Sequence, residues 1–138
     1  MQQVSVNLMA VLLCGVASMV IGFVWYSKAL FGSTWMKLSG ISEAQMKKAN
    51  SNMVMLYGTM FIASLVMAYV LAHFAKYAGA MSLTDGVVAG FWAWLGFVAT
   101  TMLTNVLYEG KPVKLYLINS GYQLVTLVVM GIILVSVV

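Results

Sequence analysis

The sequence predicts an all-α membrane protein, a four-helix transmembrane bundle with a short interfacial helix between the first and second spans. Of the 138 residues, 63% are hydrophobic and only 7% are charged, whereas about a quarter of the residues of a soluble domain are charged. Four apolar stretches are long enough to cross the hydrocarbon, which takes roughly 20 helical residues. No stretch alternates like a barrel strand, so helices are the remaining way to satisfy the backbone within lipid.

The stretches that have the length and apolar character of membrane spans are residues 4–26, 53–75, 84–108 and 113–137. The length of the chain suits a single transmembrane domain over residues 1–138. Such a domain needs no large internal core because lipid covers its outer surface. The lipid bilayer is therefore its predicted environment.

The first span carries small residues on one side and ends in aromatic residues. Ser18 and Gly22 lie four residues apart, a spacing that lets another helix approach closely. Trp25 and Tyr26 close the span, as is typical of aromatic residues at the membrane interface. Beyond them we expect a loop that lies on the membrane surface and places Trp35 there.

A short amphipathic helix is predicted at about residues 42–50. Ser42, followed three residues later by Gln45, is the capping-box pattern that starts a helix. Ile41 and Met46 are available to face the membrane, so we interpret this helix as interfacial.

Methionines recur every seven residues from Met46 into the second span, at Met53, Met60 and Met67. Thioethers bind Cu(I), but His and Cys are nearly absent from the chain. A row of unbranched side chains that fills a helix seam explains the spacing better. The sequence therefore predicts no metal site.

Three polar residues are expected near the membrane boundary opposite the interfacial helix: Asn7, His73 and Asp85. His73 suits either a pH-responsive site or a hydrogen-bonded interfacial anchor. Asp85 follows Ser82 by three residues and completes a capping box at the start of the third span, where its charge also suits the helix dipole.

The third span begins with a close-packing pattern. Gly86 and Gly90 form a GxxxG pair, which allows two helix backbones to meet. Trp92 and Trp94 lie deeper than an interfacial belt requires, so at least one of them is expected to pack between helices.

Polar side chains form a stripe on each of the last two spans. Residues within each stripe recur three or four apart and so share one helix face. Amides in hydrocarbon are costly unless they are paired, so we expect both stripes to face inward, towards each other or towards a cavity. The predicted intramembrane cluster consists of Thr101, Asn105 and Glu109 with Asn119, Tyr122 and Gln123, and Thr126 continues the second stripe.

The distribution of lysines predicts the orientation of the chain. Six of the seven lysines lie in or beside the first and third connections, and only Lys76 lies beside the second. The positive-inside rule then places both termini outside a multi-pass protein of the cell inner (cytoplasmic) membrane. The lysines are scattered and the chain has no arginine, so nucleic-acid binding is not expected.

Several motifs together resemble a bacterial family of small integral membrane proteins known as domain of unknown function 1761. They are Asn7, Ile21-Gly22, Trp25-Tyr26, Leu30-Phe31-Gly32, Trp35, Leu95-Gly96-Phe97, Asn105, Glu109 and Leu117-Ile118-Asn119-Ser120-Gly121-Tyr122. The resemblance implies a compact four-helix membrane protein. It brings no activity, substrate or catalytic residue with it.

The residues favour a non-enzymatic helix-packing or binding module, with the small-residue faces supporting a homo-oligomer. The alternative is a small-solute or ion transporter or channel with a polar pathway between the third and fourth spans. An enzyme is disfavoured because His73 and Glu109 should lie on opposite membrane faces, roughly 30 Å apart. No metal spacing, P-loop or dinucleotide fingerprint occurs, so no cofactor is expected, and the sequence names no ligand.

Overall fold

The computed structural model describes residues 3–137, which are helical apart from short connections and the extended segment before the first helix. Four helices are long and apolar enough to cross a membrane: α1 (Leu8–Trp25), α4 (Met53–Tyr77), the continuous helix Leu83–Glu109, and α7 (Val113–Ser136). No strand occurs within this described part of the chain. The all-α prediction with four spans is confirmed.

The third span is divided into three helical segments. These are α5 (Leu83–Ala93), the π-helical turn η1 (Trp94–Ala99) and α6 (Thr100–Glu109). The hydropathy of this span predicts one uninterrupted helix, and a π-turn has no simple sequence signature. At this turn Trp94 donates from Nε1 to the carbonyl oxygen of Ser120 at 2.8 Å, whereas Trp92 is 62% exposed. One of the two tryptophans thus packs between helices, as predicted.

The first helix begins four residues later than predicted, because Asn7 caps it. The Asn7 side-chain oxygen accepts hydrogen bonds from the backbone N–H groups of Met9 at 2.9 Å and Ala10 at 3.4 Å. An N-cap residue has an extended backbone and satisfies N–H groups that lack a partner within the helix. Residues 3–6 therefore form an extended segment that leads into α1.

The connection between the first two spans contains two short helices. The short helix predicted at about residues 42–50 is confirmed as α3 (Glu43–Asn50), and both hydrogen bonds of the Ser42–Gln45 capping box form. The segment around Trp35, predicted as a loop, is instead the helix α2 (Gly32–Ser39), which ends at Gly40 in the left-handed region. No side chain caps the start of α2, so the pattern that reveals α3 is missing there.

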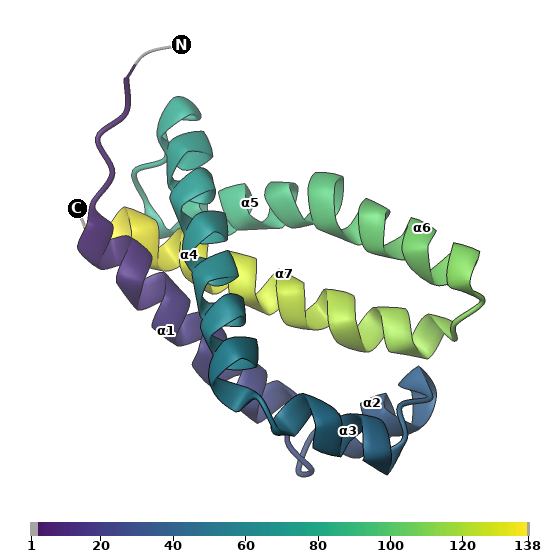
Figure 1. Ribbon diagram of the computed structural model, residues 1–138. Coiled ribbons are helices and arrows are strands. Elements are labelled where there is room, and N and C mark those ends of the chain that lie inside the picture. The colour runs from purple at the N-terminus through teal and green to yellow at the C-terminus, as the bar shows by residue number, and fades with distance from the viewer. Residues whose placement is uncertain (1–2, 138) are drawn as a thin grey trace.

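Figure 1 shows α7 running through the middle of the molecule, with the α5–η1–α6 helix beside it and α1 on its other side. Helix α4 crosses this layer steeply, while α2 and α3 lie at the end that also holds the α6–α7 turn. A hydrogen bond from Lys111 Nζ to the carbonyl oxygen of Ser39, 3.1 Å long, ties that turn to α2.

The core lies where α1, α4 and α7 meet. Its buried members are Val11, Cys14, Ala68, Leu71, Leu127 and Met130. The Cys14 thiol is fully buried and lies 3.6 Å from the carbonyl oxygen of Met130, which places α1 directly against α7. Most other large apolar side chains are exposed in the single chain, as expected where lipid supplies the surroundings.

Glycines bring α5 and α7 into backbone contact. A Cβ atom added at Gly86 would lie 2.5 Å from the carbonyl oxygen of Gly131, and one added at Gly90 would collide with the carbonyl oxygen of Leu127. Helices approach this closely only where side chains are absent. The GxxxG face of the third span is therefore in contact with α7 of the same chain.

Candidate functional site

The end of α1 is hydrogen-bonded to the first half of α7. Tyr26 donates its hydroxyl to the side-chain oxygen of Asn119 at 2.7 Å, and Trp25 donates from Nε1 to the carbonyl oxygen of Ile118 at 2.9 Å. The Asn119 amide of the fourth-span stripe thus has its partner at the end of α1, rather than on the third span.

A second group of polar contacts lies deeper between α1, α4 and α7. The Tyr122 hydroxyl lies 3.1 Å from the carbonyl oxygen of Ser18, and the Ser18 and Ser64 hydroxyls lie 3.0 Å apart. Ser64 also donates to the carbonyl oxygen of Met60 at 3.0 Å. Sequence reasoning missed Ser64, because a single serine in an apolar span shows no periodic pattern. We call Ser18, Tyr26, Ser64, Asn119 and Tyr122 the α1–α7 polar cluster.

Aromatic rings connect the cluster to α2. The Tyr26 ring meets the Tyr122 ring edge-on at 5.4 Å between centroids and the Trp35 ring at 5.8 Å. Gly22 leaves room for this arrangement, since a Cβ atom there would lie 3.3 Å from the Tyr122 hydroxyl oxygen. The interfacial aromatic residues therefore belong to the same site as the fourth-span stripe.

The stripe of the third span lies elsewhere. Thr101, Asn105 and Glu109 are all exposed on α6. Thr101 satisfies its own hydroxyl by donating to the carbonyl oxygen of Phe97 at 2.9 Å. Neither Asn105 nor Glu109 has a hydrogen bond from its side chain to any of residues 3–137. The structure does not bring the two stripes together, in contrast to the expectation that both face inward.

Packing against α7 accounts for the outward direction of the α6 stripe. Within η1 and α6 the buried residues are Ala99 and Val106, and Tyr116 of α7 donates its hydroxyl to the carbonyl oxygen of Ala99 at 3.0 Å. At 100° per residue, Asn105 lies about 100° around the helix from Val106. Apolar residues thus occupy the contact with α7, and the stripe is left on the flank.

Two further polar residues of α7 belong to neither the α1–α7 polar cluster nor the α6 stripe. Gln123 is half-buried. Thr126 is 1% exposed, and its hydroxyl has no hydrogen-bond partner among residues 3–137. A buried hydroxyl without a partner destabilises the folded state.

The three polar residues at the opposite end of the molecule are each engaged locally. Asn7 caps α1, and Asp85 accepts hydrogen bonds from the backbone N–H groups of Met81 and Ser82, both at 3.0 Å. His73 Nδ1 lies 2.8 Å from the carbonyl oxygen of Tyr69 on its own helix, and its ring stacks edge-on against that of Tyr69. These contacts account for all three residues as caps or anchors.

The model of the family described as "Protein of unknown function (DUF1761)" matches residues 9–135, nearly the whole chain. The chain belongs to the DUF1761 family. No curated protein and no solved structure gives a significant match. In this DUF1761 chain, Tyr26, Asn119 and Tyr122 of the motifs belong to the α1–α7 polar cluster, and Asn105 and Glu109 lie on α6.

The α1–α7 polar cluster consists of hydroxyl and amide groups that are hydrogen-bonded to one another and to backbone carbonyl groups. Among residues 3–137, no group of three His, Cys, Asp or Glu side chains lies close enough to hold a metal ion. The α1–α7 polar cluster thus joins helices, while the α6 stripe offers amide and carboxylate groups to whatever lies beside it.

Proposed function

We propose that this protein is a non-enzymatic membrane module that packs against a second copy of itself through the exposed stripe of α6. The observation that carries the proposal is the exposure of Asn105 and Glu109 on a helix of the third span. A polar group that faces acyl chains is costly, so a partner that pairs with it is favoured.

A second copy is the partner that fits this stripe most simply. An asparagine amide both donates and accepts hydrogen bonds, so two Asn105 side chains related by a twofold axis satisfy each other. The small-residue faces are used within the chain, where Gly86 contacts Gly131 and Gly22 contacts Tyr122. This leaves α6 as the favoured assembly surface.

Replacing Asn105 by Leu tests the proposal. Interhelical polar contacts in membranes contribute about 0.6 kcal/mol on average and about 1.7 kcal/mol at most, so the dimer dissociation constant should rise roughly three- to eighteenfold. Single-molecule photobleaching of labelled protein in lipid vesicles, at several protein-to-lipid ratios, measures this constant.

Thr104→Leu is the matched control, because Thr104 is exposed on the same helix but bonds to the carbonyl oxygen of Thr100. The control should dimerise like the wild type. A wild-type protein that remains monomeric at all ratios, or equal loss in both variants, would refute assembly through this stripe.

Permeation of a small solute or ion is the second candidate, and the same stripe favours it. In an assembly, Thr101, Asn105 and Glu109 would line a polar seam between copies, with the Glu109 carboxylate at its lysine-rich end. A liposome flux assay on the wild type and Asn105→Leu separates the two roles. Flux that Asn105→Leu abolishes supports permeation, and absence of flux for every tested solute counts against it.

The proposal includes an orientation. Both termini lie on the outer side of the cell inner membrane, and the connection between α1 and α4, which contains α2 and α3, lies in the cytoplasm. Its support is the concentration of lysines on the α2–α3 side. The non-enzymatic assignment rests on the scarcity of acid–base and nucleophilic side chains. Protease digestion of sealed inverted vesicles tests the orientation. These vesicles expose the cytoplasmic face, so the connection that contains α2 and α3 is cut only if it is cytoplasmic.

A further inference from the structure

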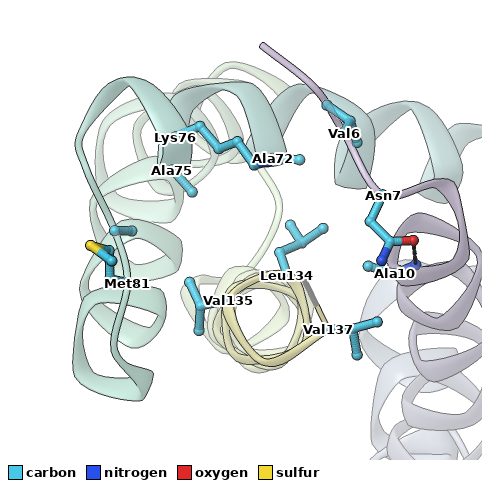
Figure 2. A pocket seen from close by; sticks show the side chains of 11 residues that line it. Val6, Asn7, Ala10, Ala72, Ala75, Lys76, Met81, Leu134, Val135 and Val137 are labelled. Atoms are coloured by element: carbon cyan, nitrogen blue, oxygen red, sulfur yellow. Dashed lines mark hydrogen bonds between the residues drawn. The ribbon is translucent and has the colours of Figure 1, made fainter.

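A cavity of about 180 Å³ lies at the end of the molecule that holds both termini. It is bounded by the extended segment around Val6 and Asn7, the last turns of α4, the turn before α5 and the end of α7. Figure 2 shows Lys76 extending from α4 away from Met81, towards the segment that carries Val6. The α1–α7 polar cluster and the α6 stripe take no part in this cavity.

The cavity exists because α4 separates from α1 and α7 at this end. The helices are close at Gly15, where an added Cβ atom would lie 3.0 Å from the Phe61 ring, and they diverge towards the termini (Figure 1). Here α4 lines the cavity with Ala72, Ala75 and Lys76. Ala72 and Ala75 are buried, at 4% and 3% exposed, and their methyl groups form an apolar floor beneath the cavity.

Lys76 supplies the positive charge beside this floor. Its Nζ donates to the carbonyl oxygen of Ser5, which satisfies a hydrogen bond but does not neutralise the charge. Of the three acids in the sequence, Glu43 begins α3 and Glu109 ends α6, both at the other end of the molecule. The third, Asp85, is occupied by the N–H groups at the start of α5.

The residues around Lys76 place it at the depth of lipid headgroups. Tyr69, His73 and Tyr77 stack along the same end of α4, with ring centroids 4.6 Å apart for the first pair and 6.3 Å for the second. Tyrosine rings with one polar tip favour the interface between hydrocarbon and water. A lysine one residue before Tyr77 therefore lies where phosphate groups are found.

We propose that this cavity binds the headgroup of an anionic phospholipid, with the phosphate on Lys76 and the glycerol–ester region over the alanine floor. A cation beside an apolar recess matches an amphiphile that carries a negative charge and an apolar body. A free phosphate shares the charge but gains nothing from Ala72, Ala75 and Leu134, so membrane lipid is the favoured source.

The test is a thermal-unfolding titration of the whole protein in non-ionic detergent with phosphatidylglycerol, phosphatidylcholine or inorganic phosphate. Phosphatidylglycerol should stabilise the wild type most, because a ligand that binds only the folded state raises the unfolding temperature. The attraction between one lysine and an anionic surface corresponds to about a fivefold change in affinity, so Lys76→Gln should weaken the apparent affinity for phosphatidylglycerol about fivefold. Lys48→Gln, an exposed lysine of α3, is the control and should leave the affinity unchanged.

Ala80→Leu tests the recess independently of charge, since Ala80 lines the cavity and is only partly buried. This variant should fold normally and lose the preference for phosphatidylglycerol. The site would be refuted if phosphatidylglycerol shifted the unfolding temperature of the wild type and of Lys76→Gln equally. It would also be refuted if Lys76→Gln and Lys48→Gln lost the same apparent affinity for phosphatidylglycerol. A shift of the same size with inorganic phosphate would overturn its assignment to a lipid.

Discussion

Gly86→Ala should destabilise the protein by forcing α5 away from α7. The added Cβ atom would lie 2.5 Å from the carbonyl oxygen of Gly131, whereas ordinary contacts begin near 3.4 Å. The obstacle is backbone, so no side chain can rotate away, and the helices must separate by roughly 1 Å. Overpacking of this kind costs about 1–3 kcal/mol.

Gly58→Ala is the matched control, because no atom lies within 4 Å of a Cβ atom added at Gly58 of α4. Both substitutions remove a helical glycine and gain the same helix propensity, about 0.5–1 kcal/mol. The difference between them therefore isolates the steric cost.

Reversible unfolding by sodium dodecyl sulfate in mixed micelles, followed by tryptophan fluorescence, measures the free energy of unfolding of both variants. Gly86→Ala should be less stable than Gly58→Ala by about 1–3 kcal/mol. Circular dichroism checks that both variants retain their helices. Equal stability would refute the close backbone contact between α5 and α7.

Two further predictions use the same unfolding assay. Thr126→Val keeps the shape of the side chain and removes a buried hydroxyl without a partner among residues 3–137, so stability should hold or rise by about 1 kcal/mol. A clear loss would show that a partner such as a buried water satisfies the hydroxyl. Asn119→Leu and Tyr26→Phe should each lower stability and couple by about 0.6 kcal/mol in a double-mutant cycle, because their side chains share one hydrogen bond. Additive effects would show that this bond contributes nothing measurable.

The fourth-span stripe shows what residue spacing can and cannot predict. Spacing alone indicates that Asn119 and Thr126 share one face of a helix, and this face is indeed turned into the protein. Spacing does not identify the neighbour, which for Asn119 is Tyr26 at the end of α1 rather than any residue of the third span. Helix order along the chain suggests the adjacent span as a partner, but contacts between distant spans depend on how all the helices pack.

The sequence by itself determined the local features of this protein: four spans, the capped starts of α3 and α5, and the close-packing glycines. Each follows from hydropathy, capping chemistry or the size of a side chain, which act over a few residues. Tertiary structure alone decided that Gly86 meets Gly131, that Asn105 faces outward, and that a cavity opens beside Lys76. The rotation and crossing of each helix arise from the packing of all the spans at once, because lipid contacts distinguish poorly between apolar faces.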